Sequence, residues 1–157
     1  MLVEAGLLSL PVLYLSRYLI RHKSEYYARL LAVTSDGDWI GWVGFIVEGI
    51  RQTALFTLQK IAGIRDLQTL MHDSLRRTVS GAVNADLLAV LFEQPYCRIS
   101  DVMHRCHVSR PTATKWLSAL ADGHVLESRR IRRERLFVNA DFLALLQREE
   151  IVDGRLS

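Results

Sequence analysis

The chain has 157 residues, of which 50% are hydrophobic and 24% are charged, and its formal net charge is +3. This balance is typical of an ordered globular protein and argues against a disordered or collagen-like chain. The length allows one large domain or two small ones. Cys97 and Cys106 are the two cysteines, so neither a disulfide framework nor a zinc module is indicated, and reduced thiols in a cytoplasmic protein fit best.

The apolar start of the chain, residues 1–20, raises the question of a membrane span or a signal sequence. Glu4, Pro11 and Arg17 interrupt this stretch, whereas a span needs about 20 predominantly apolar residues. No basic segment precedes it, as a signal sequence would require. We therefore expect no membrane association.

Helical spacing dominates the chain up to residue 80. A first helix is expected over residues 2–10. Pro11 then suits the first turn of a second helix, because its missing N–H would lack a partner there anyway. A third helix through Tyr26 and Leu30 should end at Gly37, and Asp38 can cap the helix that follows.

The helix that follows is predicted to be long, because apolar residues recur at threes and fours from Trp39 to Leu75. This is the spacing of an amphipathic helix. If continuous to Arg77, it would run about 60 Å at about 1.5 Å per residue, longer than a small domain is wide. We therefore expect either a break near Gly49 or Gly63, or a partner along the far end of the helix.

The pattern changes after residue 80 to short helices and a strand pair. Helices are expected over residues 85–93, 99–104, 112–121 and 141–150, and a β-hairpin over residues 124–128 and 135–138. This order is that of a winged helix-turn-helix spanning residues about 84–148. The predicted fold class is mainly α: an N-terminal helical segment with a long helix over residues 1–80, followed by a winged helix-turn-helix with a small β-hairpin over residues 81–157.

The third short helix has the features of a recognition helix. Ser109 is a good N-cap, Pro111 suits the first turn, and Val108 can plug the angle between this helix and the one before it. Core spacing of Ala113, Trp116, Leu117 and Leu120 directs other side chains outward, where they can reach base edges or phosphates in a major groove. The outward set comprises Arg110, Thr114, Lys115 and Ser118.

Positive charge is concentrated around this helix. Between residues 98 and 135 nine Arg and Lys residues stand against four acidic ones, a local net charge of +5, and cations at a wing tip can meet phosphates or the minor groove. The alternative is that this hairpin is a solvated face or contacts protein. The predicted DNA-binding residues are Ser109, Arg110, Thr114, Lys115, Ser118, Arg129, Arg130, Arg132 and Arg133.

The sequence contains none of the common catalytic motifs that we searched for. A nucleophile elbow, a phosphate-binding glycine loop, an HExxH helix and a paired-carboxylate site are all absent from the sequence, and the glycines at 41, 44 and 49 are better explained by close helix packing. His104, Cys106 and His107 do not supply the four ligands of a structural zinc site. We expect two surface histidines and one small buried cysteine there, and no catalytic residue, cofactor or metal.

Three motifs near the start of the chain occur in order: a proline-led LYLS stretch ending at Ser16, a Tyr-Tyr pair at 26 and 27, and Gly-Asp-Trp at 37–39 followed by Trp42. Over residues about 1–60 they resemble the part of a Fic family protein that lies just after its active-site motif. Many bacterial Fic proteins also carry a C-terminal winged helix, so the resemblance agrees with the prediction for residues 84–148.

Fic enzymes transfer AMP from ATP to a target hydroxyl, using a histidine and a glycine-rich anion-binding turn in the motif HPFxxGNGR. No histidine of this chain is followed by Pro-Phe, and no Gly-Asn-Gly occurs. No functional residue of the family therefore carries over, and this chain alone should not be an enzyme. The resemblance implies an expressed fragment or a truncated gene product that begins just beyond the motif.

Helices that would pack on a missing Fic core would leave Leu7, Leu8, Leu13 and Tyr14 exposed, and such apolar patches mark interfaces. We expect a homodimer through the N-terminal helices and the long helix, which would space two recognition helices for a palindromic site. The favoured function is a transcription regulator that binds double-stranded DNA. The alternative is a non-catalytic Fic fragment whose winged helix serves protein target binding or oligomerisation, with an upstream Fic catalytic region in a longer form.

Overall fold

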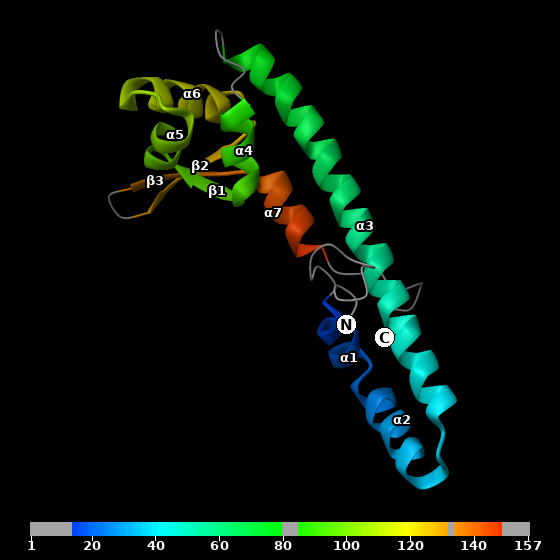
Figure 1. Cartoon of the computed structure of the whole chain (residues 1–157). Coiled ribbons are helices and arrows are strands. Elements are labelled where there is room, and N and C mark those ends of the chain that lie inside the picture. Colours follow the sequence, from blue (N-terminus) through cyan, green and yellow to red (C-terminus); the bar gives the residue numbers. More distant parts are fainter. Residues whose placement is uncertain (1–13, 80–84, 132–133, 149–157) are drawn as a thin grey trace. The chain divides into compact units, whose positions relative to one another are not determined.

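The computed structural model describes residues 14–79, 85–131 and 134–148, which are mainly helical (Figure 1). Contacts divide the chain into two compact units, Met1–Ile61 and Ala62–Ser157. The helix expected over residues 2–10 and the proline-led start at Pro11 lie outside the described residues. The elements are α1 (Leu15–Arg21), α2 (Lys23–Asp36), α3 (Trp39–Thr78), α4 (Ala85–Glu93), β1 (Tyr96–Arg98), α5 (Ile99–Cys106), α6 (Arg110–Asp122), β2 (Glu127–Ile131), β3 (Glu134–Val138) and α7 (Ala140–Gln147).

In the first unit α1 and α2 pack along the first part of α3 through aromatic side chains. The ring of Tyr18 in α1 lies 5.3 Å from that of Phe45, and Tyr26 in α2 lies 5.3 Å from Trp42. Ring centroids at such separations are typical of packed aromatic pairs. These contacts hold the three helices of the unit together.

The turn between α2 and α3 forms as its residue types predict. Gly37 ends α2 with a left-handed φ of 72°, a conformation that costs glycine little because it lacks a Cβ. The Oδ1 atom of Asp38 accepts a hydrogen bond of 2.9 Å from the Gly41 N–H, which caps α3. Both predictions for this turn are confirmed.

Helix α3 is continuous over 40 residues, so the predicted break near Gly49 or Gly63 is wrong. The other alternative, a partner along the far end, is what the structure shows: Met71 and Leu75 are buried in the core of the second unit. Burial of this apolar face stabilises a helix that would be marginal alone, and it outweighs the cost of about 1 kcal/mol for each interior glycine.

Close packing against a neighbouring helix is found at two of the three glycines for which it was predicted. At Gly49 an added Cβ would lie 2.5 Å from the Tyr18 ring, so this glycine lets α1 approach α3. At Gly44 nothing lies within 4 Å, so the packing explanation is wrong there. At Gly41 an added Cβ would meet the side chain of the capping residue, Asp38, and would lie 2.9 Å from Nη1 of Arg29 in α2.

The second unit has the predicted winged helix-turn-helix order, with one strand more than the sequence analysis expected. The strands form an antiparallel sheet in the order β1-β3-β2, and α4, α5 and α6 lie beside it (Figure 1). The missed strand, β1, has only three residues. Its pairing with β3, in which Cys97 lies opposite Phe137, depends on a distant segment of the chain.

The core of the second unit joins the sheet, α4, α5, α6 and the end of α3. Phe137 at the centre of β3 is fully buried, and the Asn139 side chain links the elements by donating to the Leu91 carbonyl and accepting from the Phe142 N–H. The buried core residues include Leu75, Leu87, Leu91, Val102, Leu117, Leu120 and Phe137. This core fixes the position of α6 relative to the hairpin.

Contacts group residues 62–79 with the winged helix. The domain boundary expected between residues 80 and 81 stays a prediction. Within the three described ranges, none of the helices combines the length and the apolar run that a membrane crossing requires.

Candidate nucleic-acid interface

Helix α6 is anchored by one apolar face, as its spacing predicts. Ala113, Leu117 and Leu120 are fully buried, and Trp116 is only 8% exposed. Ser109 stands at the N-cap with extended backbone, but its hydroxyl contacts the Thr112 hydroxyl at 3.0 Å rather than a backbone N–H. The exposed residues of the helix include Arg110, Pro111 and Lys115.

The turn before α6 is tight. His107 adopts a left-handed φ of 53°, and the Val108 N–H donates to the Met103 carbonyl at 3.3 Å. Val108 is half-buried against the core, so it does plug the angle between α5 and α6. His104 and His107 are exposed while Cys106 is buried, as expected.

The predicted recognition residues lie on the outer surface of α6. Arg110 and Lys115 are exposed, whereas Thr114 and Ser118 are half-buried. Ser118 already has a partner, because its hydroxyl accepts a hydrogen bond of 3.2 Å from Nη1 of Arg135 in β3. This bond joins the helix surface to the hairpin of β2 and β3, which we call the wing.

The register of the wing sorts its arginines onto two faces. Side chains alternate along a strand, and residues directly opposite each other on antiparallel strands share a face. Arg130 lies opposite Arg135, and Ser128 lies opposite Phe137. We call the face that carries these four side chains the inner face of the wing. Arg129 lies opposite Leu136 on the other, outer face.

Carboxylates neutralise the arginines of the outer face. Nη2 of Arg129 lies 2.7 Å from Glu127, and Nε of Arg98 in β1 lies 2.9 Å from Glu134 in β3. The structure therefore separates Arg129 from the α6 surface and brings Arg130 to it. Arg132 and Arg133, the other two arginines predicted to bind DNA, lie outside the described residues.

Four cations around α6 have no such neutralising partner. Among the described residues, no carboxylate lies within ion-pair distance of Arg110, Lys115, Arg130 or Arg135. We call these four the unmatched cations. Two of them belong to α6 and two to the inner face of the wing, and one of these, Arg135, is bonded to the half-buried Ser118 of α6.

Arg135 is the residue of this surface that the sequence analysis did not single out. In the sequence alone it contributes only to the local net charge. The signal was present, because Arg135 precedes the apolar Phe137 by two residues and so shares its face of the strand. The sequence does not show that this face of the strand lies next to α6, because that depends on which residues Phe137 packs against in the folded chain.

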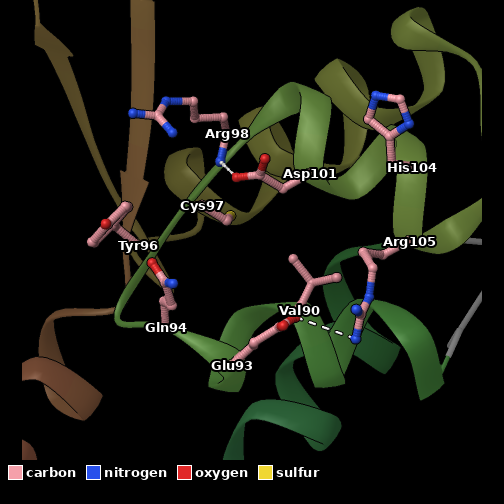
Figure 2. Close-up of a pocket in the computed structure, with 9 residues that line it drawn as sticks. All are labelled: Val90, Glu93, Gln94, Tyr96, Cys97, Arg98, Asp101, His104 and Arg105. Atoms are coloured by element: carbon pink, nitrogen blue, oxygen red, sulfur yellow. Dashed lines mark hydrogen bonds and ion pairs between the residues drawn. The ribbon is translucent and has the colours of Figure 1, made fainter.

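A pocket lies elsewhere in the second unit, where α4, β1 and α5 meet (Figure 2). Its charged side chains are matched within the protein: Nη2 of Arg105 lies 3.3 Å from Glu93, and Asp101 accepts a bond of 2.7 Å from the backbone N–H of Arg98. Internally paired charges leave little for a charged ligand, so this pocket is a weaker candidate than the α6 surface.

The two cysteines belong to the core rather than to a reactive site. Burial raises the pKa of the Cys97 thiol to about 12 and also raises the pKa of Cys106, so both are protonated thiols at neutral pH. In the part of the chain that the structure describes, no three His, Cys, Asp or Glu side chains come together as metal ligands would.

Comparison with known protein families gives a match over residues 67–142, to the family described as Protein adenylyltransferase SoFic-like, C-terminal domain. The matched range runs from the end of α3 to the start of α7 and contains α6 and both strands of the wing. It excludes the LYLS, Tyr-Tyr and Gly-Asp-Trp motifs, so the match rests on a different part of the chain from those motifs.

Proposed function

Residues 67–142 form the C-terminal domain of a Fic-family, SoFic-like protein, and from this premise we propose that the chain is a DNA-binding winged-helix protein. In this proposal it is a cytoplasmic transcription regulator whose α6 enters the major groove of double-stranded DNA while the wing contacts the backbone beside it. The HPFxxGNGR motif does not occur in this sequence, so the proposal assigns the chain no adenylyl transfer of its own.

The observation that supports DNA binding most directly is that the four unmatched cations belong to α6 and to the wing face bonded to it through Arg135 and Ser118. Arg98, Arg105 and Arg129 each pair with a carboxylate, whereas the cations of α6 and the inner face have no such partner among the residues that the structure describes. Unpaired cations are free to neutralise phosphates and release counterions, which is the main source of nonspecific affinity for DNA. Thr114 and Ser118 add short polar groups suited to base edges.

Salt-dependent binding to a labelled random duplex, measured by fluorescence anisotropy, tests this function. The chain should bind with a Kd in or below the nonspecific range of about 10⁻⁴–10⁻⁶ M, and the affinity should fall linearly with salt on logarithmic axes. Lys115→Ala should change sequence preference, and Arg130→Ala should weaken all sequences alike.

The matched control for these variants is Arg105→Ala, which removes one arginine that is already paired with Glu93. It should leave DNA affinity within about twofold, because a screened surface pair contributes little. Binding that is absent or independent of salt would instead favour the alternative, in which the winged helix contacts a protein target.

We also propose that the chain forms a homodimer through α3. Ile40, Val43 and Val47 are 88%, 54% and 57% exposed, and the same spacing continues through Ile50 and Ala54 to Ile61, with Thr57 at the one polar position. This is the spacing of a helix that pairs with another helix along one seam. The same seam on a second copy is complementary to itself, as a two-fold interface requires.

A further inference from the structure

The inner face of the wing places two like charges side by side. Arg130 and Arg135 lie directly opposite each other in the register of β2 and β3, and neither is among the arginines that pair with a described carboxylate. Like charges directly opposite on neighbouring strands destabilise a sheet. A bound anion between them would remove this repulsion.

Arg135 is also held in place by three side chains, one each from β2, α6 and its own strand. Its Nε donates to the Ser128 hydroxyl of β2 at 2.6 Å, and its Nη1 donates to the Ser118 hydroxyl of α6 at 3.2 Å. The guanidinium carbon lies 4.9 Å from the ring centroid of Phe137, a cation–π distance. Since Phe137 is fully buried, the guanidinium rests on a rigid support.

These contacts leave Nη2 of Arg135 without a partner among the described atoms. A guanidinium that is already oriented loses less conformational entropy when it binds a ligand than a free surface arginine does. Its planar set of donors matches the oxygens of a phosphate group. Arg130 then completes the cation pair from the neighbouring strand.

We propose that Arg130 and Arg135 form a clamp for one phosphate of the duplex DNA backbone, and that Ser118 and Ser128 position Arg135 within it. The clamp rests on the proposed DNA-binding function and adds to it a residue and the chemical group that this residue binds. Because Ser118 belongs to α6, the clamped phosphate borders the groove in which α6 lies. The clamp thereby sets how deeply the helix enters that groove.

The first test compares Arg135→Gln with Arg129→Gln on the same DNA duplex. Each variant removes one wing arginine, but Arg129 lies on the outer face and pairs with Glu127. Arg135→Gln should lower affinity about tenfold or more, as expected for a charge-assisted hydrogen bond, and reduce the logarithmic salt slope by about 0.9. Arg129→Gln should change affinity by about twofold or less.

Arg135→Lys separates the role of the charge from that of the guanidinium. The lysine keeps the positive charge but lacks the planar donor set that reaches both serines and the phosphate. Affinity should fall while the salt slope stays near that of the unmodified chain. A salt slope left unchanged by Arg135→Gln would overturn the clamp, even if that variant melts at a lower temperature.

The second test needs no DNA. At constant ionic strength, inorganic phosphate should raise the Tm of the unmodified chain and of Arg129→Gln, whereas Arg130→Gln and Arg135→Gln should show no such rise. An equal rise in all four proteins would overturn the clamp. A selective rise together with no binding of duplex DNA would support the phosphate clamp and overturn the proposed function.

Discussion

The two units of the chain differ in how much of their apolar surface they bury. The second unit has a core that joins four helices to a sheet around Phe137. In the first unit the buried side chains among the described residues are Tyr18, Phe45 and Thr53, while apolar residues such as Ile40 and Leu58 remain mostly exposed. The second unit is therefore stabilised by its own buried core, whereas the described part of the first unit leaves apolar surface exposed.

The two units also differ in how their charges are arranged. Two of the ion pairs described in the first unit connect neighbours on one helix, Arg29 with Glu25 and Arg51 with Glu48, and a third joins Arg29 to Asp38 at the start of α3. In the second unit, by contrast, the unmatched cations of α6 and of the inner face of the wing have no carboxylate partner within the ranges that the structure describes. Exposed charges paired in this way contribute little to stability, and under the proposed function the second unit makes the DNA contact while the first makes the dimer contact.

The largest effect is expected in the core of the second unit. Phe137→Ala should lower the free energy of unfolding by about 3–5 kcal/mol, because it removes a buried ring and leaves a cavity. Urea unfolding followed by circular dichroism measures this loss. Tyr96→Ala is the control, because Tyr96 is 43% exposed and should cost much less. Equal losses would contradict the view that this core sustains the winged helix.

A smaller effect is expected where α1 meets α3 in the first unit. Gly49→Ala would place a Cβ 2.5 Å from the Tyr18 ring, and overpacking of this kind costs about 1–3 kcal/mol. Gly44→Ala meets nothing within 4 Å, so it should instead stabilise the helix by about 0.5–1 kcal/mol. Thermal unfolding should shift in opposite directions for the two variants. A shift to higher temperature in both would argue against the packing of α1 on α3.

A substitution in the exposed apolar seam of α3, which includes Ile40, Val43 and Val47, should change the oligomeric state rather than the stability of the folded chain. Val47→Asp adds a charge at a residue that is 57% exposed, so the folding of one chain should change by about 0.5 kcal/mol or less. Sedimentation velocity should show a dimer for the unmodified chain and a monomer for this variant. Leu70→Asp is the control at a similarly exposed apolar residue of the same helix. A monomer before any substitution would refute the proposed homodimer.

Residue types and their spacing were sufficient for most of the local structure. The end of α2 at Gly37, the cap at Asp38 and the buried face of α6 through Leu117 all follow from short-range geometry. Continuity of α3 did not follow, because the helix is stabilised by a core that residues far along the chain complete. The strand β1 was not predicted either, because three residues are too few to show the alternating pattern of a strand.

By itself the sequence determined that a basic hairpin follows a helix with one apolar face, because both features repeat at spacings set by the backbone. The tertiary structure alone decided which arginines are available to a ligand. Arg129 and Arg130 are chemically identical neighbours, yet strand alternation sends them to opposite faces. Glu127 neutralises one of them, while the register with β3 sets the other beside Arg135. Pairing of this kind depends on which strand and which helix lie next to the hairpin, and only the folded chain brings them together.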